Sequence, residues 1–258
     1  MKFTEKIRSR MHEVGNVLVI GLDSDVEKLP KKFPQNAHGI YEFNKSIIEK
    51  TGDIVCAYKI NSAFYEAFGP EGMITLLKTR DLIGDLPVIY DVKRGDIEST
   101  AKSYAKAVFD FFNFDAVTLS PYMGSDAIDP FLNYKDKYAF VVCLSSNKSA
   151  IDFEYHGTPP LYAKVAKFVD DKNKKYGNCG LVVGATVSEK LLEISLMAKE
   201  SLILIPGIGT QGGDVETTMN SVEHDRILVN VSRSIIFSED PSKSAREYSK
   251  MLSIMNSL

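Results

Sequence analysis

The six residues from Asp91 to Asp96, with sequence DVKRGD, have the clearest potential for chemistry in this chain. They follow a short apolar run at 87–90 that is typical of a buried strand. Residues two apart in a strand face the same side, so Asp91 and Lys93 should project together from its carboxyl end. Asp96 comes three residues later, past a turn at Gly95. Two carboxylates and an ammonium this close are costly to desolvate unless they satisfy one another, which makes the cluster a candidate for catalysis.

A second candidate site is the glycine-rich stretch 206–213, with sequence PGIGTQGG. Such a loop exposes consecutive backbone N–H groups, and a following helix N-terminus would complete an anion site. Arg233 could add a forked, charge-assisted contact to the same phosphate. The alternative is a loop that is merely flexible.

The elements that must position these residues alternate regularly between short apolar runs and longer segments with helical spacing. An amphipathic helical segment comes first, and eight apolar runs follow at 17–21, 54–60, 87–90, 116–119, 138–144, 180–183, 202–205 and 227–231. Continuous apolar strands alternating with helices indicate a parallel sheet that is buried on both faces. Eight such units in 258 residues predict a (β/α)8 barrel, the TIM barrel, as a single domain over residues 1–258. A doubly wound open sheet is the competitor, but no GxGxxG follows the first run.

Active sites of these barrels lie at the carboxyl ends of the strands. The polar residues found there are Asp23, Asp25, Lys59, Asn61, Asp91, Lys93, Asp96, Ser120, Ser145, Ser146, Asn230, Ser232 and Arg233. Each of them alone could be a turn former, a helix cap or a surface charge. Their convergence on one end of the barrel favours a functional site.

The overall composition narrows the possible partners and the compartment. The formal net charge is −3, with no basic run, which argues against binding to nucleic acid or to an anionic membrane. Three widely spaced cysteines with no CxxC indicate a reducing compartment, so we expect a cytoplasmic protein. The four histidines are scattered and match no metal-binding spacing, so no metal site is predicted.

Taken in order, these motifs resemble the orotidine 5′-phosphate decarboxylase family. The resemblance rests on Lys59, DVKRGDI at 91–97 with Thr100 after it, the PGIG loop and Arg233, and it extends from about residue 21 to residue 235. The pattern looks most like the subgroup of small stand-alone enzymes. Ser232 departs from it, because many relatives have glycine there.

The resemblance implies decarboxylation of orotidine 5′-phosphate to uridine 5′-phosphate, the last step of de novo UMP biosynthesis, without a cofactor. Lys93 would stabilise the carbanion formed at C6 and then protonate it. Asp91 and Asp96 would flank Lys93 and keep it protonated, because nearby negative charge favours the ammonium form. Lys59 would neutralise Asp91 and hydrogen-bond the ribose. This alternation of charges would be a preorganised field of the kind that often dominates catalysis.

The resemblance also implies how the substrate is held. Ser145 would bind the pyrimidine amide edge, and Gln211 would bridge the base and the phosphate. Substrate-binding residues would be Asp23, Asn61, Ile97, Thr100, Ser145, Pro206 and Gln211; phosphate-binding residues would be Gly207, Ile208, Gly209, Gln211, Ser232 and Arg233. Family members share their sites across a homodimer, with Asp96, Ile97 and Thr100 entering the neighbour's site. Asp23 is favoured over Asp25 as the ribose contact.

Two other functions remain as alternatives. One is a Mg-dependent sugar-phosphate decarboxylase or synthase of the same barrel superfamily. Those relatives place an acidic metal ligand at the end of strand two, where Lys59 would repel a divalent cation. The other is a non-catalytic nucleotide-phosphate binder, although every expected charged position is intact.

Overall fold

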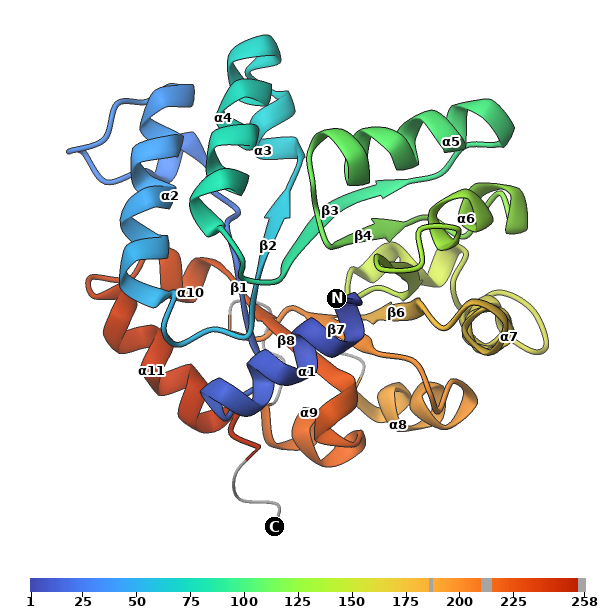
Figure 1. Ribbon diagram of the computed structural model, residues 1–258. Coiled ribbons are helices and arrows are strands. Elements are labelled where there is room, and N and C mark those ends of the chain that lie inside the picture. Colours follow the sequence, from blue (N-terminus) through green and yellow to red (C-terminus); the bar gives the residue numbers. More distant parts are fainter. Residues whose placement is uncertain (186–187, 210–214, 255–258) are drawn as a thin grey trace.

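Eight parallel strands close into a barrel in which each strand pairs with its neighbours in chain order and the last pairs with the first (Figure 1). This computed structural model describes residues 1–258 apart from 186–187, 210–214 and 255–258. The strands are β1 (Leu18–Gly21), β2 (Ala57–Asn61), β3 (Val88–Arg94), β4 (Ala116–Leu119), β5 (Tyr138–Leu144), β6 (Cys179–Val183), β7 (Ile203–Pro206) and β8 (Ile227–Val231). The predicted (β/α)8 barrel is therefore confirmed.

Helices surround the barrel and shield its outer face (Figure 1). They are α1 (Phe3–Val14), α2 (Ala37–Thr51), α3 (Ala63–Glu66), α4 (Gly69–Ile83), α5 (Glu98–Lys106), α6 (Ser125–Leu132), α7 (Leu161–Tyr176), α8 (Ser188–Met197), α9 (Val215–Ser221), α10 (Arg233–Ile236) and α11 (Pro241–Met251). The helix that follows β3 is α-helical only to Lys106 and continues as a π-helical turn, Ala107–Phe111. No helix in the described part of the chain is long and apolar enough to cross a membrane.

The amino-terminal helix α1 covers the end of the barrel where the strands begin (Figure 1). Phe3, at its first turn, packs its ring against Tyr138 and Phe140 of β5, and its backbone N–H donates to the carbonyl of Asp136. Ile7 and Met11 follow at helical spacing and are buried as well. With this end covered, the carboxyl ends of the strands form the opposite rim.

The strands are apolar throughout because both of their faces are buried. Every residue of β1, β4, β6 and β8 is buried, which explains continuous apolar runs where a half-exposed strand would alternate. All three cysteines are free and buried in this interior. Such thiols pack as small apolar groups, as predicted for Cys56 and Cys143.

One strand departs from regular geometry, and it does so at the predicted catalytic motif. β3 extends to Arg94, beyond the predicted end at Tyr90, and its register against β4 shifts between Tyr90 and Arg94. Within this irregular stretch Lys93 has a φ of 46°. A non-glycine residue rarely adopts positive φ, so surrounding contacts must hold this backbone in place.

Candidate active site

Four side chains with alternating charge form a row at the carboxyl ends of β1, β2 and β3. Lys59 Nζ lies 3.3 Å from Asp23 Oδ1 and 2.9 Å from Asp91 Oδ2. Lys93 Nζ lies 2.6 Å from the other oxygen of Asp91, Oδ1. The Asp91 carboxylate thus bridges two ammonium groups, and the order along the row is Asp23, Lys59, Asp91, Lys93. The expected proximity of Asp91 and Lys93 is present.

Burial and mutual charge determine how this row ionises. Burial opposes ionisation of Asp91, but the ammonium groups of Lys59 and Lys93 outweigh it and hold the pKa of Asp91 well below its ordinary value. Burial likewise opposes the charge on Lys59, yet Asp23 and Asp91 raise its pKa above the ordinary value. The two buried partners therefore keep each other charged across the neutral range.

Accessibility differs sharply along the row. The side chain of Lys59 is 4% exposed and that of Asp91 is 10% exposed, whereas that of Lys93 is 52% exposed. The first two side chains are buried inside the protein, whereas the ammonium group of Lys93 is accessible to solvent. Of the four charged groups, Lys93 is therefore the most accessible to a ligand.

Thr118, in the middle of β4, supports both Asp91 and the unusual backbone at Lys93. Its hydroxyl donates to Asp91 Oδ1 at 2.9 Å and accepts the backbone N–H groups of Val92 and Lys93, each at 3.0 Å. Its side chain is buried. Ser120 was the residue predicted at this strand end, and Thr118 was not predicted. The available signal was a single polar residue in an otherwise apolar strand.

These groups line a cavity of about 290 Å³ at the carboxyl ends of the strands. The predicted residues that line it are Asp23, Lys59, Asn61, Asp91, Lys93, Ser145, Pro206, Gly207, Ile208, Ser232 and Arg233. Asn230 and Ser146, also noted at strand ends, line it as well. Its apolar wall comes from Val142, Leu144 and Val182, none of which was a predicted site residue. Such strand residues look the same in sequence whether they face the core or a cavity.

The glycine loop after β7 adopts backbone conformations that favour glycine. Gly207 has a φ of 107° and Gly209 a φ of 94°. A side chain at Gly209 would also collide with Ser234 and Tyr248, since an added Cβ would lie 2.6 Å from Ser234 Oγ. Gly209 is not among the residues that line the cavity. Gln211, predicted to bridge base and phosphate, lies outside the described residues.

Next to this loop, Ser232 and Arg233 lie where the neighbouring strand β8 passes into α10. Ser232 has a φ of −115°, so this position does not require a glycine backbone, and serine fits where many relatives carry glycine. Its hydroxyl accepts a hydrogen bond from the Asn230 amide at 3.1 Å. Both Ser232 and Arg233 line the cavity, which places a guanidinium beside the loop.

Besides Gly209, three further predicted site residues do not line the cavity of their own chain: Asp96, Ile97 and Thr100. The Asp96 carboxylate accepts the backbone N–H of Ile97 at 2.8 Å. Among the described residues, the ion pairs of Lys93 include Asp91 but not Asp96. Within one chain Asp96 therefore forms no ion pair with Lys93, and its expected place beside the Lys93 of a neighbouring chain stays a prediction. Ile97 is 47% exposed at this turn.

The two acids after β1 have separate roles. Asp23 pairs with Lys59 and lines the cavity. Asp25 caps the short 3-10 helix Val26–Lys28 by accepting the N–H of Glu27, and it pairs with Lys28. Of the two acids only Asp23 lines the cavity, and its contact with the ribose stays a prediction.

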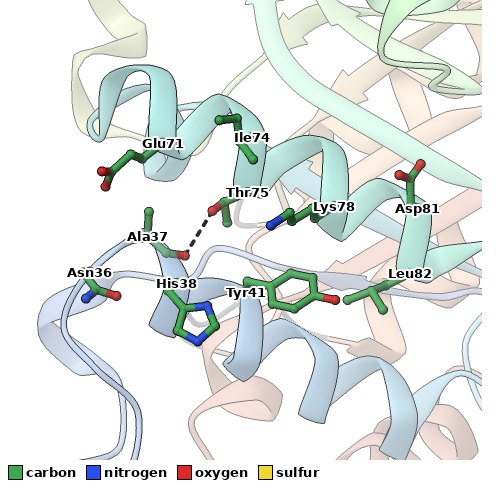
Figure 2. Close-up of a pocket in the computed structure, with 10 residues that line it drawn as sticks. All are labelled: Asn36, Ala37, His38, Tyr41, Glu71, Ile74, Thr75, Lys78, Asp81 and Leu82. Carbon is green, nitrogen blue, oxygen red and sulfur yellow. Dashed lines mark hydrogen bonds between the residues drawn. The ribbon is translucent and has the colours of Figure 1, made fainter.

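A larger hollow lies elsewhere, on the outer face of the barrel between α2 and α4 (Figure 2). It has a volume of about 650 Å³. The Thr75 hydroxyl bridges the two helices by donating to the carbonyl of Ala37 at 3.2 Å. Lys78 lies over the ring of Tyr41, 5.9 Å from its centroid. We call this hollow, lined by the ten residues labelled in Figure 2, the α2–α4 groove.

No group of three or more histidine, cysteine, aspartate or glutamate side chains suited to a metal ion occurs in the part of the chain that the structure describes. In the cavity, the acids Asp23 and Asp91 are separated by the ammonium of Lys59, which pairs with both of them. This donor set suits an anionic organic ligand better than a divalent cation.

Comparison with known proteins shows extensive similarity to one family. The model of a family described as "Orotidine 5′-phosphate decarboxylase / HUMPS family" matches residues 16–248. An orotidine 5′-phosphate decarboxylase from Herpetosiphon aurantiacus is 42% identical over 253 residues, covering 96% of this chain and 94% of that protein. One from Thermomicrobium roseum is 41% identical over 253 residues, covering 95% and 90%.

Solved structures give the same picture. A putative orotidine-monophosphate decarboxylase from Toxoplasma gondii superposes with a TM-score of 0.93 at 35% identity, covering 97% of this chain and 96% of that one. The orotidine-monophosphate decarboxylase of Leishmania donovani superposes with a TM-score of 0.88 at 35% identity, covering 98% of both chains. The similarity thus covers nearly the whole chain.

Proposed function

The chain belongs to the orotidine 5′-phosphate decarboxylase / HUMPS family and decarboxylates orotidine 5′-phosphate to uridine 5′-phosphate, and we propose that Lys93 is the residue that stabilises and protonates the carbanion. The observation that carries this assignment is the charge row, in which two buried partners hold an accessible ammonium at the wall of the cavity. The reaction completes UMP biosynthesis.

The chemistry requires a positive charge beside C6 of the pyrimidine and a proton for it. Breaking the bond between C6 and the carboxylate releases CO2 and leaves the electron pair on C6. The Lys93 ammonium stabilises this pair and then donates a proton to C6, after which the neutral amine regains a proton from solvent. Because Asp91, Lys59 and Thr118 are already in place, the field at C6 needs little reorganisation during the reaction.

The remaining lining residues suit the other parts of the substrate. Arg233 and the glycine loop would bind the phosphate, because a guanidinium and exposed backbone N–H groups both favour an oxyanion. Asp23, Lys59 and Asn61 would hydrogen-bond the ribose hydroxyls. Ser145 would bind the polar edge of the pyrimidine. Binding at the remote phosphate then helps to hold C6 against Lys93.

A spectrophotometric assay tests the activity and separates the alternatives. The ultraviolet absorbance of orotidine 5′-phosphate should fall when the purified protein is added, at the same rate with and without EDTA. Loss of activity in EDTA would instead support a Mg-dependent enzyme, which the ammonium of Lys59 opposes. Binding of the nucleotide with no absorbance change would support a non-catalytic binder.

We also propose that two copies of the chain share their active sites. Asp96, Ile97 and Thr100 lie at or near the exposed start of α5 and do not line their own cavity. This placement supports their use by a neighbouring subunit in a twofold dimer, which would bring each Asp96 to the Lys93 of its partner.

Mixing two inactive variants tests the shared site. Lys93→Ala and Asp96→Ala should each be nearly inactive as pure dimers. In a mixed dimer, one site would have the intact Lys93 of one chain and the intact Asp96 of the other. Activity should therefore recover to about one quarter of wild type after full exchange of a 1:1 mixture. If Asp96 acts in its own chain, mixing will restore nothing.

We further infer that the enzyme works in the cytoplasm, since its three cysteines are buried free thiols. Fractionation of cells that express the chain, followed by the decarboxylase assay on each fraction, would test this location.

A further inference from the structure

We propose that Glu154 is a positioning residue that selects which pyrimidine the cavity accepts, by fixing the direction of the hydrogen bond made by Ser145. The inference deepens the proposed function, because it rests on the role of Ser145 at the pyrimidine edge. Nothing in the sequence motifs points to Glu154. It lies 9 residues after Ser145, in the segment that links β5 to α7.

The contacts of Glu154 converge on one residue. Its Oε2 accepts the backbone N–H of Ser145 at 2.7 Å, and the Ser145 hydroxyl lies 2.9 Å from Oε1 and 3.0 Å from Oε2. The Glu154 backbone is itself anchored: its N–H donates to Ala150 at 2.8 Å, and its carbonyl accepts from Tyr162 at 2.9 Å. Both carboxylate oxygens of Glu154 are thus held against Ser145, because the backbone of Glu154 is anchored by hydrogen bonds.

Glu154 and Ser145 line two different cavities. Ser145 lines the strand-end cavity, and Glu154 is not among the residues that do. Glu154 instead lines an adjacent cavity of about 310 Å³. It can therefore influence a ligand in the strand-end cavity by acting through Ser145.

The chemistry of the partners sets the direction of the hydrogen bond. A serine hydroxyl has one proton to donate and two lone pairs that accept. A carboxylate can only accept, so Glu154 takes the proton and leaves Ser145 with lone pairs to offer. Asn147 Oδ1 also lies 2.6 Å from this hydroxyl, but an amide can turn and present its NH2 group instead. The carboxylate of Glu154 is therefore the partner that fixes the direction.

The consequence is selectivity at the ring nitrogen next to the exocyclic group. An orotate or uracil ring carries an N–H there, which can donate to the lone pair of Ser145. A cytosine ring carries a bare nitrogen there, which would face a lone pair and gain no hydrogen bond. A site built to pair with one polar group rejects a ligand that lacks it, because the polar groups are then left unpaired.

Glu154→Gln is the decisive variant, because it keeps the shape and reverses the direction. The glutamine oxygen would take the Ser145 backbone N–H, and its NH2 group would donate to the hydroxyl oxygen. The hydroxyl proton would then be free to point into the cavity. Inhibition constants of UMP and CMP should show a wild-type preference for UMP that falls by about tenfold in Glu154→Gln. Glu154→Ala, with no polar group, should lie between them.

Matched controls separate this inference from the proposed function. Asp152→Asn makes the same change of charge on an exposed acid two residues away and should leave the UMP to CMP ratio unchanged. Ser145→Ala should abolish the preference. Suppose that Ser145→Ala abolishes the preference while Glu154→Gln and Glu154→Ala keep the wild-type ratio of UMP to CMP inhibition constants. Glu154 then does not set the direction of the hydrogen bond, and this inference fails while the assignment of Ser145 stands. If Ser145→Ala also keeps the ratio, the assignment of Ser145 fails with it, whereas the decarboxylase activity is judged separately by turnover.

Discussion

The strand-end cavity and the α2–α4 groove differ in a way that shows what marks a functional site. The groove is more than twice as large, about 650 Å³ against about 290 Å³. Its charged residues, Glu71, Lys78 and Asp81, are all exposed. In the cavity, by contrast, Lys59 and Asp91 are buried and paired. Charges in contact with water are screened, whereas buried charges interact strongly and are costly to maintain without a purpose.

The backbone differs between the two regions as well. The groove lies between two regular helices, α2 and α4, each of 15 residues. The cavity is bordered by a register shift in β3, a positive φ at Lys93 and two positive-φ glycines after β7. Unusual backbone persists where surrounding contacts impose it, and here Thr118 supplies such contacts. Volume alone would therefore have pointed to the wrong region.

The largest effect that would test this comparison is expected at Lys93. Lys93→Ala removes both the positive charge beside C6 and the proton donor, so kcat should fall by about 10⁴-fold or more. Binding of UMP should remain measurable, because the phosphate contacts are untouched. Steady-state kinetics and calorimetry would show this. Turnover close to wild type would mean that the charge row is not the catalytic feature of the cavity.

A smaller loss is expected on the phosphate side of the same cavity. Arg233→Ala removes a charge-assisted contact, so kcat/KM should fall by roughly 10²-fold, mainly through a higher KM. The Arg233→Lys variant keeps the charge but loses the forked guanidinium, so its kcat/KM should fall less. Initial rates over a range of substrate concentrations separate the two constants. A loss confined to kcat would contradict the phosphate assignment.

Substitution of Thr118 tests how much the hydrogen bonds that hold Asp91 and the Lys93 backbone contribute to catalysis. Thr118→Val keeps the shape but removes the donor to Asp91 and the acceptor for two backbone N–H groups. We expect kcat to fall by about tenfold and stability by about 1–3 kcal/mol, the usual result of leaving buried polar groups unpaired. Thr118→Ser, which keeps the hydroxyl, is the matched control. Equal effects of both variants would show that packing, not hydrogen bonding, is what Thr118 provides.

These residues also show how far the sequence could predict the molecule. The eight strands were located because burial on both faces makes their apolar runs continuous, and the charge row was located because charges at strand ends interrupt those runs. Thr118 and Glu154 were missed for a physical reason. Each acts through contacts with residues distant in sequence or in an irregular loop, and no periodicity records such contacts. The start of α5 illustrates a further limit, because its proposed role depends on a second chain.

The smallest effect is expected in the α2–α4 groove, and it completes the comparison. Lys78→Glu reverses an exposed charge that contacts the ring of Tyr41. Since surface charges contribute little, we expect unfolding free energy to change by no more than about 0.5 kcal/mol and kcat/KM by less than about twofold. Thermal melts and the decarboxylase assay would measure both. A tenfold loss of kcat/KM with normal stability would show that the groove is coupled to the cavity, and burial of charge would then not separate the two regions.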